Sequence, residues 1–95
     1  MKDKFPYEEA AGMLKVVAHP VRLAIIKLLK SSRMNVNHIQ SEIGLKQSIT
    51  SQHLNIMAGK GILRREKEGN EVFYSINMKE VLKLMACIEG CCEKR

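Results

Sequence analysis

The sequence lacks most features that mark membrane, secreted and enzymatic proteins. No apolar run approaches the roughly 20 residues that a membrane-spanning helix needs. The first residues, MKDKFPYEE, carry charges where a secretory signal has an apolar segment, so we expect a cytoplasmic protein without a membrane partner. Phosphate loops, nucleophile elbows and HExxH zinc motifs are also absent, and we therefore predict that the protein is not an enzyme.

Glycine, proline and cysteine are scarce. Six glycines and two prolines are too few for a disordered or low-complexity chain. The three cysteines, Cys87, Cys91 and Cys92, all lie near the end of the sequence. Because an odd count in a reducing compartment is more typical of free thiols than of disulfides, we expect all three to be reduced.

The residues that are present suit one small domain spanning positions 1–95. Apolar residues make up 45% of the chain, which is enough for a hydrophobic core. The formal net charge is +6, which weakly favours an anionic partner such as nucleic acid. A chain this short buries only about 60–65% of its unfolded surface when it folds alone, so self-association would stabilise it.

Apolar residues at helical spacing predict four helices in the first two thirds of the chain, over 7–19, 20–31, 36–43 and 47–60. His19-Pro20 separates the first two, since proline favours a helix start. Asn35 or Asn37 is expected to cap the third helix, and Gly44 to end it. The fourth helix, with Lys46 or Ser48 near its cap, is expected to bury the residues at i, i+4 and i+7: Thr50, Leu54 and Met57.

The pattern then changes to the alternation of β-strands. Residues 62–67 and 71–76 flank Glu68-Gly69-Asn70, a hairpin turn signal, with Phe73 and Ile76 expected to pack inward and Tyr74 to be a strand residue. A last helix is predicted over 78–90, capped by Asn77. A short helix, a turn, a second helix and a hairpin make up a winged helix-turn-helix, so we predict a mostly helical α+β fold of order α-α-α-α-β-β-α.

The fourth helix has the composition of a DNA-recognition helix. Charged residues are absent from 47 to 59, and short hydrogen-bonding side chains that can contact base edges or phosphates gather on one face. The candidates are Lys46, Gln47, Ser48, Ser51, Gln52 and Asn55, with His53 at the margin. The alternative is an ordinary polar helix face, which the neighbouring turn and hairpin make less favoured.

The hairpin would be the wing. Alternation places Arg65 and Lys67 on one side, where they can reach DNA phosphates together with Gly69 and Asn70 at the tip. The alternative is a solvated edge hairpin whose charges prevent aggregation.

Three stretches in the order VVAHPVRLAIIKLL, IQSEIGLKQSITSQHLNIMAGKGIL and RREKEGNEVFYSIN resemble the ArsR family (ArsR/SmtB) of bacterial winged-helix repressors. The resemblance covers residues 7 to about 90, and SQHL matches the Ser-x-His-Leu core of the family's recognition helix. It implies a homodimer that forms through the first and last helices, binds double-stranded DNA at a pseudo-palindromic operator and leaves it on binding an inducer.

The inducer is less defined. The stretch MNVNHIQ lacks the cysteines of one metal-sensing type in the family, and the last helix lacks the Asp/His set of another. Cys87, Cys91 and Cys92 suit a thiophilic metal or metalloid ion, or thiol oxidation. The alternative is that Cys87 is a small interface residue and the other two have no role. No other cofactor is predicted.

Two other functions compete with a DNA-binding repressor. A winged-helix module can bind a protein partner through the same helix, but such a surface favours aromatic residues over the polar ones found here. A small thiol-dependent enzyme has only the cysteines in its favour.

Overall fold

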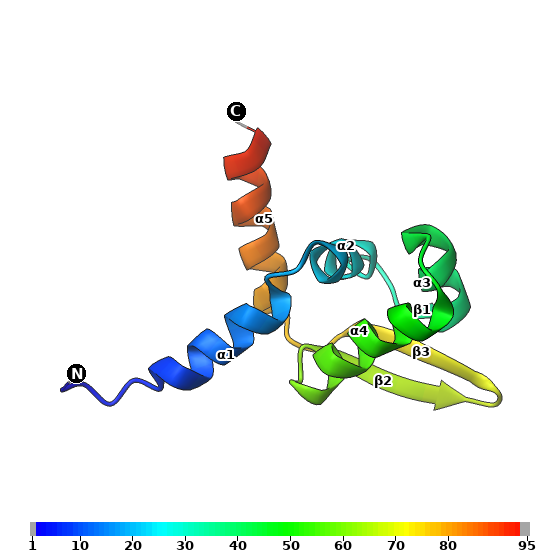
Figure 1. Ribbon diagram of the computed structural model, residues 1–95, viewed down its shortest axis with the longest axis horizontal. Coiled ribbons are helices and arrows are strands. Elements are labelled where there is room, and N and C mark those ends of the chain that lie inside the picture. The colour runs from blue at the N-terminus through cyan, green and yellow to red at the C-terminus, as the bar shows by residue number, and fades with distance from the viewer. Residues whose placement is uncertain (1, 94–95) are drawn as a thin grey trace.

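The computed structural model describes residues 2–93 as five helices and three short strands (Figure 1). In chain order the elements are α1 (Tyr7–Val17), α2 (Pro20–Leu28), β1 (Met34–Asn35), α3 (Val36–Ile43), α4 (Gln47–Gly59), β2 (Leu63–Glu68), β3 (Glu71–Ile76) and α5 (Glu80–Glu93). The helix-turn-helix consists of α3 and α4, and the hairpin β2–β3 follows it directly. The predicted winged helix-turn-helix is therefore confirmed.

The short helix α3 begins and ends where the sequence predicted. The side-chain oxygen of Asn35 accepts a hydrogen bond of 2.8 Å from the backbone N–H of His38, so Asn35 is the N-cap. Gly44 follows the last turn with φ of 81°, in the left-handed region that glycine adopts without strain. These two residues fix the turn that leads into α4.

The sheet contains one strand that the sequence did not predict. The two-residue strand β1 pairs with β3, with Met34 opposite Tyr74 and Asn35 opposite Phe73, while β2 pairs with the other edge of β3. A two-residue strand is too short to show alternation, so only the contact with β3 reveals it. It ties the segment before α3 to the wing.

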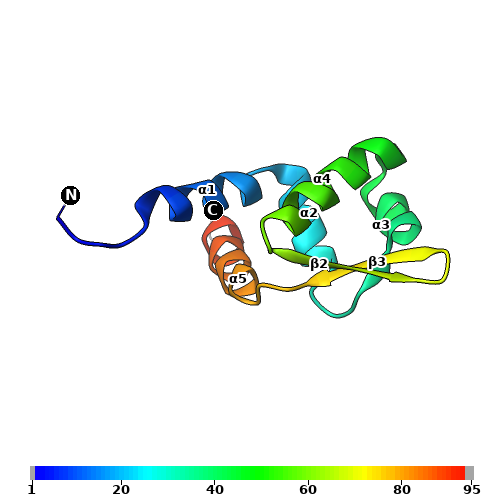
Figure 2. The ribbon, with the colours of Figure 1, turned by 90° about the horizontal axis from the view of Figure 1, so that it is seen from below.

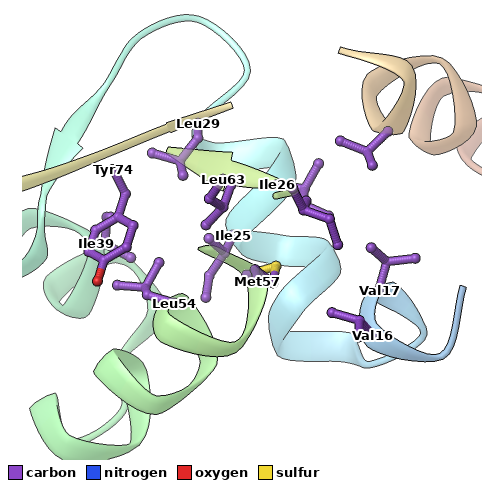
Figure 3. Packing of buried hydrophobic residues seen from close by; sticks show 12 residues of the cluster. Val16, Val17, Ile25, Ile26, Leu29, Ile39, Leu54, Met57, Leu63 and Tyr74 are labelled. Atoms are coloured by element: carbon purple, nitrogen blue, oxygen red, sulfur yellow. The ribbon is translucent and has the colours of Figure 1, made fainter. Parts of the chain in front are cut away.

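The hydrophobic core lies between α2, α3, α4 and the inner face of the sheet (Figure 3). Ile25 and Ile26 of α2 and Ile39 of α3 are fully buried. Leu54 and Met57 of α4 are buried with them, as is Thr50, so the predicted inner face of α4 is confirmed.

Several local predictions were wrong. Helix α2 ends at Leu28, with Lys30 exposed beyond it. Helix α5 begins at Glu80, and Asn77 does not cap it, because the side-chain amide of Asn77 donates instead to the carbonyl of Gly61 at 3.0 Å. Phe73 does not pack inward: alternation turns Tyr74 into the core, so Phe73 lies on the opposite face of β3.

The outer helices α1 and α5 lie at one end of the molecule and the wing at the other (Figure 2). The first turns of α1 extend away from the body towards the N-terminus, and α5 projects beyond the sheet (Figure 1). Within residues 2–93, no helix combines the length and the hydropathy that crossing a membrane requires.

Candidate nucleic-acid interface

Helix α4 presents a polar surface opposite its buried side. Its exposed or half-exposed positions include Lys46, Gln47, Ser48, Ser51 and Gln52, all of which the sequence assigned to DNA. The N-cap residue Lys46 provides no side-chain acceptor for the first turn, so the N-terminal N–H groups of α4 are not capped by a side chain. Such N–H groups and a neighbouring lysine both favour an anion.

One apolar side chain in the first turn of α4 joins this surface, since Ile49 is 40% exposed. An exposed apolar side chain on a recognition helix can contact a thymine methyl group. Helical spacing alone did not find it, because Ile49 lies at the boundary between the two faces.

The strand register divides the wing into two different faces. Arg65 lies opposite Tyr74, and Lys67 lies opposite Val72, so both cations share the sheet face of Leu63 and Tyr74, which is the face that packs towards the core. Both side chains are nevertheless exposed. Arg64, Glu66 and Glu68 occupy the other face.

The wing tip lies close to the start of α4. A polar hollow of about 170 Å³ is lined both by Gln47 of α4 and by Asn70 of the wing tip, with Asn35 and Asn37 of the α3 start beside them. Gly69 in the turn has φ of 61°, the left-handed conformation that the tight hairpin requires. The structure thus brings together two candidate sites that are 23 positions apart in the sequence (70 minus 47).

The outer face of the wing is held by Arg33. Its guanidinium donates to both carboxylate oxygens of Glu68, at 2.9 and 3.0 Å, and lies 4.2 Å above the centre of the Phe73 ring. The hydrogen bonds from Arg33 and its charge lower the pKa of Glu68 below the usual 4.5. Because Arg33 engages Glu68, the charge on this face is largely balanced.

A second contact joins the inner face of the wing to α4. The buried Tyr74 donates a hydrogen bond of 2.8 Å from its hydroxyl to the side-chain oxygen of Asn55. The sequence placed Asn55 on the DNA face, but its oxygen is used inside the subunit.

His53 is likewise engaged within the subunit. Its ring is half-buried, its Nδ1 accepts a hydrogen bond of 3.0 Å from Nε of Arg22, and its centre lies 4.6 Å from that of His19. Burial lowers the pKa of His53 below the usual 6.5, and the charges of His19 and Arg22 lower it further. At neutral pH His53 is therefore an uncharged acceptor.

Comparison with known proteins identifies the family. Residues 19–65 match the family model described as bacterial regulatory protein, arsR family. The chain is 42% identical over 86 residues to the transcriptional repressor PagR of Bacillus anthracis, and the match covers 86% of each chain. This chain belongs to the arsR family.

Solved structures agree with this assignment. The crystal structure of Rv0081 of Mycobacterium tuberculosis matches the arsR-family chain with a TM-score of 0.83 at 28% identity, covering 97% of this chain and 93% of that one. A solution structure of Mb0332 of Mycobacterium bovis, described as a homodimeric winged helix-turn-helix DNA-binding domain, matches with a TM-score of 0.82 at 22% identity, covering 100% and 93%. The similarity to Mb0332 shows that the two chains share the same fold.

The outer helices of the arsR-family chain leave an apolar cleft. It has a volume of about 350 Å³ and lies between α1 and α5, with Met13, Leu14, Val81 and Leu84 among its lining residues. Leu14 is 55% exposed, although it is fully apolar. The family resemblance implied a homodimer that forms through these two helices, and the exposed leucine agrees with that expectation.

The three cysteines, Cys87, Cys91 and Cys92, lie on α5 and are all exposed free thiols. Among residues 2–93, the structure places no three Cys, His, Asp or Glu side chains where they could hold one metal ion. A single subunit therefore does not form the three-thiolate site that the sequence suggested.

Proposed function

We propose that this arsR-family chain is a homodimeric transcriptional repressor that binds double-stranded DNA at a pseudo-palindromic operator. The main support is the surface of α4. One side of this helix is buried in the core, while the other side is polar, uncharged and next to the cationic face of the wing. A helix of this width fits the major groove of DNA, and the wing reaches the neighbouring backbone. We also propose that the protein acts in the cytoplasm, where it would bind DNA.

In this proposal α4 and the wing have separate roles. Gln47, Ser48, Ser51 and Gln52 contact base edges, while Lys46 and the uncapped N–H groups of α4 contact a phosphate. Arg65, Lys67 and the tip residues Gly69 and Asn70 contact the sugar-phosphate backbone without reading sequence. We assign no DNA contact to His53, because Arg22 and His19 engage its ring.

The homodimer is supported by the apolar cleft between α1 and α5. A second copy related by a two-fold axis would cover the exposed Leu14 and present two copies of α4 to successive major grooves. The homodimeric description of Mb0332, which has the same fold, agrees with this arrangement.

We further propose that the signal that releases the repressor from DNA acts on the cysteines of α5. The exposed thiols of Cys87, Cys91 and Cys92 are accessible to a thiophilic metal, a metalloid or an oxidant. Because one subunit does not gather three ligands, a metal site would need thiols from both α5 helices of the dimer. The serine variant of all three cysteines would lose the response to such inducers while keeping DNA affinity.

Selection of bound duplexes from a random DNA pool tests the function directly. We expect enrichment of a sequence with two-fold symmetry, bound with an affinity that falls steeply as salt rises. Arg65→Glu should weaken binding to every duplex, whereas Gln52→Ala should change the selected sequence. A protein that ignores all duplexes at low salt and tolerates Arg65→Glu would instead be a protein-binding winged helix.

A further inference from the structure

Arg22 connects three helices through its guanidinium. It lies on α2, its Nη1 donates to the carbonyl of Val16 in the last turns of α1 at 3.0 Å, and its Nε donates to Nδ1 of His53 on α4 at 3.0 Å. Arg22 is half-buried, so these hydrogen bonds are partly shielded from water. One side chain thus joins α1, at the apolar cleft, to the helix that would enter DNA.

The contact requires a neutral histidine. Nδ1 of His53 accepts a hydrogen only when it carries no proton, so the proton of the neutral ring is on Nε2. Protonation of Nδ1 would remove the acceptor and place a cation against Arg22. The ring of His19, 4.6 Å away, would add further repulsion if it were also charged.

We propose that Arg22 and His53 are a positioning pair that fixes α4 relative to α1, and that proton uptake by His53 releases α4 and weakens DNA binding. The inference rests on the proposed function, since it concerns how the recognition helix is held. Neither residue is assigned a contact with DNA.

The charges around His53 favour such a response. From the α2 side it faces Arg22 and His19, and Arg22 in turn donates to the carbonyl of Val16 on α1. Within residues 2–93, the charged groups that shift its pKa are His19 and Arg22, and neither is an acid that would stabilise the imidazolium. The remaining ionisable groups of the elements packed on α4 lie at exposed positions: Tyr7, Glu8, Glu9 and Lys15 on α1, Lys27 on α2, His38 and Glu42 on α3, and Arg64, Arg65, Glu66, Lys67 and Glu68 on β2.

The sign of the pH effect distinguishes this pair from general electrostatics. Acidification adds positive charge to histidines, which by itself strengthens binding to a polyanion. Release of α4 has the opposite effect. Because the pKa of His53 lies below 6.5, we expect the affinity of the wild-type protein for its selected duplex to fall as the pH is lowered below 6.5 at constant salt, by about tenfold once His53 is protonated.

Two substitutions of His53 isolate the hydrogen bond. His53→Asn offers a carboxamide oxygen near the position of Nδ1 that cannot be protonated, so we expect it to bind DNA at neutral pH and to lose the acid-induced weakening. His53→Leu removes the acceptor and should bind about tenfold more weakly already at neutral pH. If His53→Asn kept the full acid-induced weakening, or His53→Leu bound as tightly as wild type, the pair would not position α4.

Arg22→Met tests the other partner. It should weaken DNA binding about tenfold at neutral pH, whereas Lys30→Met, which removes the same charge from an exposed position after α2, should change it by less than about twofold. Equal affinities of these two variants would overturn the inference while leaving the repressor function intact. A wild-type protein that bound no duplex at any pH would contradict both this inference and the proposed repressor function.

A measurement without DNA checks the contact itself. Nitrogen-15 NMR of the free protein should show an unprotonated Nδ1 of His53 at neutral pH. Arg22→Met should shift the backbone signals of α1 and α4 together. A protonated Nδ1 at neutral pH, or shifts confined to α2, would contradict the pair even if Arg22→Met were too unstable for binding assays.

Discussion

Tyr74 donates its hydroxyl hydrogen to Asn55 across 2.8 Å, and this bond joins the wing to the recognition helix. Tyr74 is buried at the centre of β3, while Asn55 lies at the exposed edge of α4. We expect Tyr74→Phe to lower the free energy of unfolding by about 1 kcal/mol, because a neutral hydrogen bond is lost without opening a cavity. Urea unfolding measures this.

Tyr7→Phe is the matched control. It removes the same hydroxyl, which there bonds to Asp3 at the exposed start of α1, so a smaller loss of stability is expected. Equal losses of stability in the two variants would mean that the Tyr74–Asn55 hydrogen bond stabilises the fold no more than an exposed one does.

Leu14 tests the proposed dimer. Its side chain is 55% exposed and lines the apolar cleft between α1 and α5. Leu14→Glu should convert the dimer to monomers in sedimentation experiments, because a carboxylate would be buried without a partner. The unfolding of the monomer should change little, as the core does not contain Leu14. A dimer that persisted in Leu14→Glu would exclude the cleft as the interface.

The wing cations should appear in the salt dependence of DNA binding. Replacement of Lys67 by Gln removes one phosphate contact in each subunit, so the slope of log affinity against log salt should fall in magnitude by about 0.9 per contact. Sequence preference should stay unchanged. Lys30→Gln is the control, and a slope equal to that of wild type in Lys67→Gln would show that this face of the wing does not approach the backbone.

Arg33 sets the ionisation of Glu68. Because its hydrogen bonds and charge lower the pKa of Glu68 below 4.5, Arg33→Ala should raise that pKa towards 4.5, as carbon-13 NMR titration of the carboxyl group can measure. The stabilisation from a lowered carboxyl pKa is fully present above 4.5 and is lost as pH falls through the lowered value. Stability of Arg33→Ala should therefore depend less on pH in this acid range.

Arg64→Ala provides the comparison, since Arg64 lies on the same outer face of the wing but does not contribute to the shift of Glu68. A similar change in both variants would assign the shift to the general positive field of the wing.

Local sequence signals predicted the parts of the fold that depend on neighbouring residues. Asn35 and Gly44 bound α3 because a cap and a left-handed glycine act within one helical turn. Thr50, Leu54 and Met57 were predicted as the inner face of α4 because their spacing alone places them together. The order of elements, and with it the winged helix-turn-helix, followed from these signals.

The parts that were missed depend on contacts between distant segments. Strand β1 exists because Met34 reaches Tyr74, and no local pattern encodes that pair. In sequence, Asn55 does not differ from its polar neighbours on α4, and only the hydrogen bond from the distant Tyr74 to its side-chain oxygen distinguishes it. In the same way, alternation predicted two faces for β3 but could not decide whether Phe73 or Tyr74 faces the core.

The short strand β1 has a consequence for how the molecule can respond to a signal. Because Met34 and Asn35 pair with β3 directly before α3 begins, backbone hydrogen bonds join the helix-turn-helix to the hairpin. The DNA-reading end should then behave as one stiff block. A signal at the other end of the molecule would then move that block as a whole relative to α1 and α5, and so alter the separation between the two copies of α4 in a dimer.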